Sequence, residues 1–350
     1  MNISKYFKNI IFTIIIVICV FGGLEGLARI KCSTIRRKSR NLFEYDENKI
    51  FRHKKNFKTV FTGVEVVTNS FGHRDEEIPI KKEAGEYRIL ALGDSVTFGH
   101  GVLAKETYPE IIEDLFKMKK GIKVNVINTA CCGNSTVQEY YDFKESLCFK
   151  PDRVILQFTL NDVTEPYFAY KKYGGFGDDY NRVCGLRNYD HFLRQYSAFY
   201  VLLKKTGRII KHKLFSIGLL KKKVIDRKIY TTTNGLTKQD DPRIAASWET
   251  CFDLMKKIQA ICVENNFPLT IIAIPIRFQA TDSLGVDLDT PLGTFCRDNN
   301  IDYIDYKPIF LEEFKKGGAW EDYFSDTCHF SKKGHQFVAN HLYEKFAKDL

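Results

Sequence analysis

Residues Arg88 to Ser95 read RILALGDS, an apolar run that leads directly into Gly93-Asp94-Ser95. Such a run, bounded by a turn signal, predicts a buried β-strand. Gly93 permits a sharp turn where the strand ends. We therefore expect Ser95 at an exposed strand end, where a base and a substrate can both approach its hydroxyl.

A candidate base lies 234 residues further along the chain. Asp326-Thr327-Cys328-His329 precedes a predicted helix over Lys332 to Lys348. A carboxylate three residues before a histidine can hydrogen-bond the imidazole within one short turn, which fixes its tautomer and favours the imidazolium. Each motif alone is common in surface turns, so the prediction depends on their combination. We expect Asp326 to orient His329, and His329 to accept the proton of Ser95.

Two further predicted strands end in groups that can bind an oxyanion. Val124 to Asn128 is followed by TACCGNST. Gly133 in this segment has no side chain, so a substrate oxygen can approach its backbone N–H closely. Val154 to Phe158 is followed within three residues by Asn161, whose amide is a donor. The carboxyl ends of strands in an open α/β sheet share one crevice. The alternatives are a turn glycine and a helix cap.

The chain resembles the SGNH hydrolases, also called the GDSL esterase and lipase family, in four blocks that occur in the family's order. The blocks are Gly93-Asp94-Ser95, Gly133, Asn161-Asp162, and Asp326 with His329. Two positions depart from the pattern: Thr159 stands where the asparagine block usually has glycine, and the residues after the serine read VTF where many members have a leucine.

The resemblance covers roughly residues 87 to 350 and implies a flavodoxin-like α/β/α sandwich with a parallel sheet. It implies an acyl-serine intermediate without metal or cofactor. The implied oxyanion hole consists of the Ser95 N–H, the Gly133 N–H and the Asn161 side chain.

Alternating strands and helices in the remaining sequence also favour a parallel sheet. Helices are expected at 107–119, 136–148, 243–265, 291–299 and 332–348, and strands at 269–274 and 302–304. Residues 43–86 contain the strand pattern TVFTGVEVV and predict a small β extension. In this extension Asn69, Ser70, Gly72 and Arg74 are similar to a turn found upstream of the serine block in many bacterial members.

Residues 165–241 form a predicted insertion into the hydrolase domain. Within it, Lys204 to Lys228 holds ten lysines or arginines and one acidic residue, in a chain of net charge +10. We interpret this basic run as a solvated helical lid or spacer, and an amphipathic helix on an anionic membrane surface is the alternative. Nucleic-acid binding is not expected, because no nucleic-acid-binding motif accompanies the charge.

Residues 1–42 predict a single-pass membrane anchor with a basic flank. Ile10 to Leu24 is uncharged and mostly apolar, and it reaches the length of about 20 residues that a spanning helix needs if it extends from Tyr6 to Leu27. Lys8 would then snorkel, and Glu25 would lie near the interface. A cleaved signal peptide is the alternative.

The orientation of this anchor has two opposing indications. Six basic residues between 29 and 40 follow the apolar run, and the positive-inside rule would leave the catalytic domain in the cytoplasm. Membrane-tethered members of the family more often face outward, and on this resemblance we expect an extracytoplasmic domain.

Ten cysteines occur without a CxxC pair or a ligand-like spacing to histidine, so neither a metal site nor a cofactor is expected. Several cysteines and histidines lie near the candidate site in sequence. We interpret them as packing or solvated residues: Cys131, Cys132, Cys328, His100, His335 and His341.

The sequence therefore predicts a serine esterase that hydrolyses a carboxylic ester, for example of an O-acetylated glycan or a lipid. The same residues would serve an O-acyltransferase that modifies a polysaccharide. A third alternative is an inactive binding or scaffold protein with the same fold, but intact Ser95, Asp326 and His329 favour an enzyme. The expected partners are the ester substrate and, through the N-terminal helix, the membrane.

Overall fold

The computed structural model describes residues 3–31, 42–163, 193, 197–200, 202–204, 206–207, 210, 242–276, 279 and 289–350. The chain divides into two compact units, one of residues 1–41 and 181–225 and one of residues 42–180 and 226–350. Most of the predicted insertion over 165–241, including most of its basic run, lies outside the described residues.

The larger unit is built on a five-stranded parallel sheet in the order β6-β5-β7-β8-β9. The strands are β5 (Tyr87–Leu92), β6 (Val124–Asn128), β7 (Arg153–Phe158), β8 (Leu269–Ala273) and β9 (Asp302–Asp305). β5 lies between the next two strands of the chain, with β6 on one side and β7 on the other. This strand order is the flavodoxin-like one, so the predicted fold class is confirmed, and the switch point of the sheet lies at the carboxyl end of β5, where ligands bind in such sheets.

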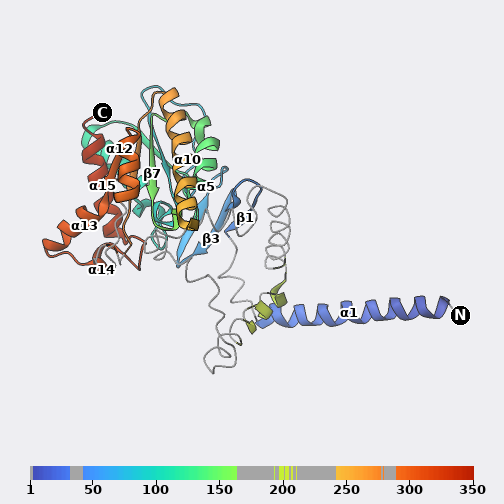
Figure 1. The fold of residues 1–350 in the computed structure, drawn as a ribbon. Coiled ribbons are helices and arrows are strands. Elements are labelled where there is room, and N and C mark those ends of the chain that lie inside the picture. Colours follow the sequence, from blue (N-terminus) through green and yellow to red (C-terminus); the bar gives the residue numbers. More distant parts are fainter. Residues whose placement is uncertain are drawn as a thin grey trace. The chain divides into compact units, whose positions relative to one another are not determined.

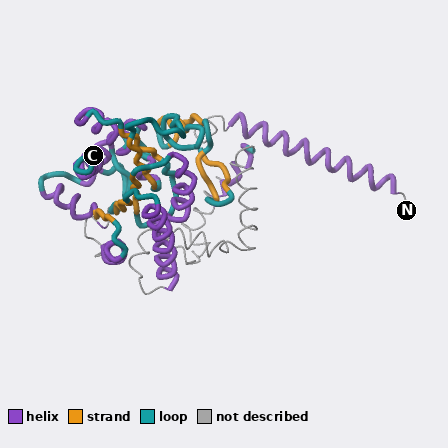
Figure 2. The backbone as a smooth tube through the Cα atoms, turned by 90° about the horizontal axis from the view of Figure 1, so that it is seen from above, coloured by secondary structure: helices purple, strands orange, loops and turns teal. Residues whose placement is uncertain are grey.

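Both faces of the sheet are buried, because apolar side chains alternate between two cores. Leu90 and Leu156 belong to one core, and Ile89 and Ile155 to the other. Figure 1 shows α5 and α10 on one face and α15 on the other, and Figure 2 shows helices on both sides of the strands. The architecture is therefore the predicted three-layer sandwich.

Among the described residues of this unit, a helix lies at each of the five expected positions, and further helices that were not predicted lie before and between them. In chain order, the described helices are α3 (Ser95–Phe98), η1 (Ala104–Glu106), α4 (Tyr108–Lys120), α5 (Thr136–Ser146), η2 (Leu147–Phe149), α10 (Pro242–Glu264), η4 (Asp289–Gly293), α12 (Thr294–Asp298), α13 (Tyr306–Lys315), α14 (Trp320–Tyr323) and α15 (Lys332–Phe346).

The segment before the sheet contains two antiparallel hairpins. β1 (Phe43–Asp46) pairs with β2 (Ile50–His53), and β3 (Phe57–Phe61) pairs with β4 (Val64–Thr68). Val66 of β4 packs with Phe98, Ala130 and Cys132 in a small core of its own. These hairpins therefore contact the loops that follow β5 and β6.

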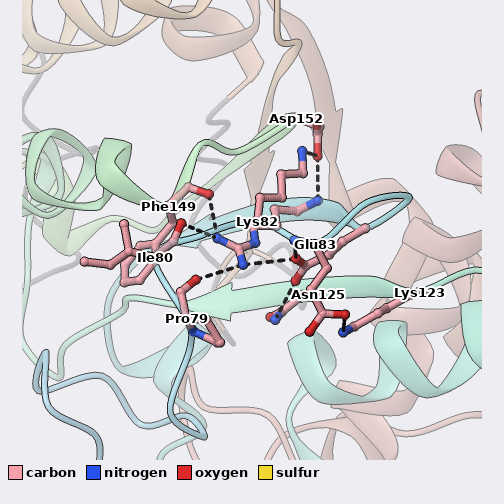
Figure 3. Close-up of polar contacts among 10 residues, drawn as sticks. Pro79, Ile80, Lys82, Glu83, Lys123, Asn125, Phe149 and Asp152 are labelled. Carbon is pink, nitrogen blue, oxygen red and sulfur yellow. Dashed lines mark hydrogen bonds and ion pairs between the residues drawn. The ribbon is translucent and has the colours of Figure 1, made fainter.

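Arg88 joins several segments at the amino end of β5, among them those that carry Pro79, Phe149 and Asp152, which Figure 3 labels. Its buried guanidinium donates to the carbonyl oxygens of Phe149 at 2.9 Å and Pro79 at 2.8 Å, and to the Glu86 carboxylate at 3.0 Å. Its backbone N–H donates to Asp152 at 2.7 Å. A buried cation must be paired and hydrogen-bonded to be tolerated, and this arrangement meets that requirement.

In the smaller unit, α1 (Ile3–Lys31) contains an apolar stretch, Ile11–Ile30, of 20 residues with a mean hydropathy of 2.4. The large apolar side chains of this stretch are exposed, as a membrane-spanning helix or a signal sequence would present them. Glu25 accepts hydrogen bonds from the Ser197 hydroxyl and from the N–H groups of Ala198 and Phe199, at 2.8 to 3.0 Å. It thereby caps the helical residues 198–200.

Arg88→Met should lower the free energy of unfolding by about 3–5 kcal/mol, because the Glu86 carboxylate would stay buried without its cation. Denaturation by urea, followed by tryptophan fluorescence, measures the change, since both tryptophans, Trp248 and Trp320, lie in the sandwich. Lys123→Met, which removes an exposed pair with Glu83, is the control and should change little. Equal effects of the two variants would contradict this account of Arg88.

Candidate active site

Ser95 lies where the chain leaves β5 and is the first residue of α3. A β-carbon on Gly93 would lie 2.5 Å from Thr97 Oγ1 and 2.6 Å from Gln157 Oε1, so only glycine fits this turn. Asp94 caps α3, because its Oδ1 accepts from the Val96 N–H at 2.8 Å. The turn thus presents the half-buried Ser95 at the carboxyl edge of the sheet.

The structure brings His329 and Asp326 together with Ser95. His329 Nε2 lies 2.8 Å from Ser95 Oγ, and His329 Nδ1 lies 2.7 Å from Asp326 Oδ2. Asp326 Oδ1 accepts from the N–H groups of Cys328 and His329, each at 2.9 Å. A serine, an imidazole and a carboxylate in this sequence of contacts have the geometry of an activated nucleophile.

The Asp326 carboxylate is ionised. Burial alone raises its pKa, but hydrogen bonds from the Cys328 N–H and from the ring and N–H of His329 outweigh burial and bring the pKa to about 2. An ionised carboxylate at Nδ1 favours a proton on that nitrogen. His329 Nε2 is then free to accept the proton of Ser95.

The turn that carries the base is held from both sides. The Trp320 indole N–H of α14 donates to the Asp326 carbonyl at 2.9 Å, and the Ser325 N–H donates to the His329 carbonyl at 2.8 Å. After the turn, the Ser331 hydroxyl caps α15 by accepting from the Gly334 N–H at 3.2 Å. The helix expected behind His329 therefore begins directly after it.

Asn161 connects the serine turn with the loop that contains Gly133. Its Nδ2 donates to Asp94 Oδ2 at 2.9 Å and to the Asn134 carbonyl at 3.2 Å. Gly133 has a φ of +84°, which favours glycine, and it is exposed. Ser95 is the first residue of its helix, so its N–H has no acceptor within that helix. The three predicted oxyanion donors thus lie at the ends of neighbouring strands.

Thr159, which stands in the usual glycine position, has a defined role in this arrangement. Its hydroxyl lies 3.1 Å from Asp94 Oδ2 and also contacts Asn161 Oδ1. The contact directs the oxygen of the Asn161 amide toward the hydroxyl and its nitrogen toward Asp94. The departure from the family pattern therefore leaves the amide oriented.

Sequence reasoning did not identify two residues that support the site. His100 was interpreted as packing or solvation, but its ring stacks on the His329 ring, with centroids 4.0 Å apart and planes 19° apart. Arg74 was noted only as part of a turn. Its buried guanidinium donates to the carbonyls of Phe98, Gly99 and Val102 at 2.6 to 3.0 Å, so it holds the loop that presents His100. Arg74 stood out in the sequence as part of that turn, and this was the feature from which its supporting role could have been found.

A second support runs behind α3. Gln157 Oε1 accepts from the Thr97 hydroxyl at 3.0 Å, and this hydroxyl lies 2.9 Å from the Tyr108 hydroxyl. The Tyr108 N–H in turn donates to Nδ1 of His335, a fully buried residue of α15. The serine turn is thus connected to the helix that follows the base.

Within the described ranges, one group could hold a metal ion: His100, Asp326 and His329, whose ligand atoms all lie within 4.8 Å of one another. The stacked rings direct their in-plane lone pairs nearly parallel, whereas a metal needs donors that converge on one point. Asp326 and His329 also already bind each other. The arrangement fits proton transfer better than metal binding.

Comparison with known proteins gives a family match. The model of the GDSL-like lipase/acylhydrolase family matches residues 91–337. Similar solved structures include a member of the lipolytic protein G-D-S-L family from Veillonella parvula DSM 2008, at 14% identity and a TM-score of 0.43, covering 75% of this chain and 98% of the other. The acetyl xylan esterase AlAXEase matches at 14% identity and a TM-score of 0.43, covering 74% and 98%. A lipase/acylhydrolase from Enterococcus faecalis matches at 15% identity and a TM-score of 0.41, covering 75% and 97%. No curated protein matches the chain.

His335 should make the stability of the sandwich sensitive to acid. Burial lowers the pKa of its ring to about 3, so the folded protein keeps the ring neutral while the unfolded chain protonates it below about 6.5. Its contribution is complete above pH 6.5 and decreases as the pH falls toward 3. Between pH 7 and pH 5, wild type should lose about 2 kcal/mol more of its unfolding free energy than His335→Asn.

Urea denaturation at the two pH values measures this difference. His341→Asn is the matched control on the same helix and should give a smaller difference, because the His341 ring is only half-buried. Equal losses in wild type and His335→Asn would show that the buried ring is not kept neutral.

Proposed function

Because this chain belongs to the GDSL-like lipase/acylhydrolase family, we propose that it is a serine esterase that cleaves a carboxylic ester through an acyl-serine intermediate. The observation that carries the proposal is the pair of contacts from one imidazole, 2.8 Å from Nε2 to Ser95 Oγ and 2.7 Å from Nδ1 to Asp326 Oδ2. These contacts supply both a nucleophile and an oriented base.

In the first step, His329 Nε2 accepts the Ser95 proton while Oγ attacks the ester carbonyl carbon. The ionised Asp326 stabilises the imidazolium that forms. The imidazolium then donates its proton to the oxygen of the leaving alcohol, and the acyl group stays on Ser95. Water attacks this acyl-serine with the same base, which releases the carboxylic acid and restores the hydroxyl.

The negative oxygen of the tetrahedral intermediate is bound by the N–H groups of Ser95 and Gly133 and by the Asn161 amide. Without substrate, the amide donates to Asp94 and Asn134. It reaches the oxyanion by giving up the longer bond, 3.2 Å to the Asn134 carbonyl. The bond to Asp94 keeps the amide directed at the serine turn during this exchange.

We further propose that α1 anchors the chain as a single-pass membrane helix with the hydrolase domain outside the cytoplasm. The length and hydropathy of Ile11–Ile30 support an anchor, and a signal sequence has the same properties. Protease accessibility of the domain in intact cells tests its side, and the molecular mass of the mature chain distinguishes an anchor from a cleaved signal.

Ser95→Ala should abolish hydrolysis of p-nitrophenyl acetate, with kcat lower by a factor on the order of 10⁴ or more, because no nucleophile remains. Asn161→Ala should lower kcat by about 10² to 10³, the usual effect of losing one oxyanion donor. Steady-state kinetics measures both, and a fluorophosphonate probe should label wild type at Ser95.

Ser70→Ala, on the turn before β5, is the control and should hydrolyse the ester like wild type, because Ser70 binds only Glu77 among the described residues. Equal hydrolysis by wild type and Ser95→Ala would overturn the proposed function.

A further inference from the structure

The β1–β2 hairpin is attached to the loop that carries Gly133 through a buried ion pair. Lys49, in the turn of the hairpin, donates to Asp142 Oδ1 at 2.8 Å and to Glu145 Oε2 at 2.7 Å on α5. Asp142 Oδ2 accepts from the Asn134 amide at 2.7 Å. Breaking a buried pair is costly, so the hairpin holds a fixed position beside this loop.

Phe51 of β2 points at Gly133. A β-carbon built on Gly133 would lie 3.5 Å from Cζ of the Phe51 ring, which is ordinary van der Waals contact. Gly133 is exposed and Phe51 is half-buried, so part of the ring is free to contact a ligand. The tip of the ring therefore borders Gly133, the residue whose N–H we assign to the oxyanion.

A continuous row of rings connects Phe51 with the base. Successive centroid distances are 5.7 Å from Phe51 to Phe43, 5.8 Å from Phe43 to Phe61, 6.0 Å from Phe61 to His100, and 4.0 Å from His100 to His329. Three of these rings come from the two hairpins. Aromatic contacts therefore run from the Gly133 loop, through the hairpins, to His329.

In the proposed mechanism, the His329 end of the row of rings lies beside the leaving alcohol of the ester, and the Phe51 end lies beside its acyl group. The leaving alcohol must lie beside His329 Nε2, which donates a proton to it. The carbonyl oxygen points to Gly133 and Asn161, so the acyl chain extends away from His329. Phe51 is the member of the row furthest from His329 along these contacts, and it borders Gly133. It thus lies on the acyl side.

We infer that Phe51 closes the acyl pocket and restricts the substrate to esters of short acyl groups, with acetyl as the preferred class. This inference rests on the proposed serine esterase function. A ring held by a fixed hairpin excludes longer chains sterically, and each methylene that a pocket accepts or rejects changes kcat/KM by about 10- to 200-fold.

The test compares kcat/KM for p-nitrophenyl acetate and p-nitrophenyl hexanoate in the full chain, solubilised in detergent. Wild type should prefer acetate at least about tenfold, and Phe51→Ala should reduce this preference by about tenfold or more as the pocket lengthens. Phe57→Ala is the matched control, because Phe57 is a half-buried phenylalanine of the neighbouring hairpin outside the row of rings. It should keep the wild-type preference.

Phe51→Trp provides a second measurement that does not depend on the stability of the alanine variant. The larger ring should shorten the pocket and increase the preference for acetate over p-nitrophenyl butyrate. The inference is overturned if wild type hydrolyses hexanoate as well as acetate, or if both Phe51 variants keep the wild-type preference. Loss of the preference in Phe57→Ala would also overturn it, because the effect would then belong to the hairpin as a whole.

A failure of the proposed function gives a different result. In that case neither ester shows hydrolysis that Ser95→Ala removes, and the inference falls with the function. Hydrolysis that depends on Ser95, but whose chain-length preference does not depend on Phe51, contradicts only the inference.

Discussion

The rest of the site depends on the hydrogen bonds of the Asp94 carboxylate. One of its oxygens caps α3 and so fixes the start of the helix at Ser95, and the other accepts from the Asn161 amide. A single buried side chain therefore sets the position of the proposed nucleophile, Ser95, relative to the proposed oxyanion donor, Asn161, which follows another strand. The Thr159 hydroxyl, within 3.1 Å of the same oxygen, completes this connection between β5 and β7.

The buried cations of the chain follow a related principle. Arg74 and Arg88 both bind backbone carbonyl oxygens of irregular segments, and Arg88 also binds Glu86. Burial lowers the pKa of Arg74 to about 10, which still leaves it charged at neutral pH. Buried carbonyls outside helices and strands need donors, and a guanidinium supplies several at once. Some of the basic residues, such as Arg74 and Arg88, therefore stabilise the protein interior, and their charge does not indicate an anionic partner.

Much of the sandwich could be predicted because each strand is recognisable from its own stretch of sequence. β5, β7 and β8 are short apolar runs bounded by turns, and both of their faces are buried, which produces an uninterrupted pattern. The pairing of Ser95 with His329 was predicted from a serine at a strand end and an Asp-x-x-His turn, and the ordered blocks that resemble a family supported it. The stack of His100 on His329, the hydrogen bond from Tyr108 to His335 and the approach of the Phe51 ring to Gly133 join distant segments. Periodicity and turn residues carry no information about such contacts.

The separation of 234 positions between Ser95 and His329 has a consequence for biosynthesis. A ribosome completes β5 and the serine turn long before it reaches the turn with the imidazole, and α15 follows that turn. A nascent chain that lacks this region has a hydroxyl without its proton acceptor, and one face of its sheet is incompletely covered. Under the proposed mechanism, the chain can hydrolyse an ester only after the ribosome has translated the turn that carries His329.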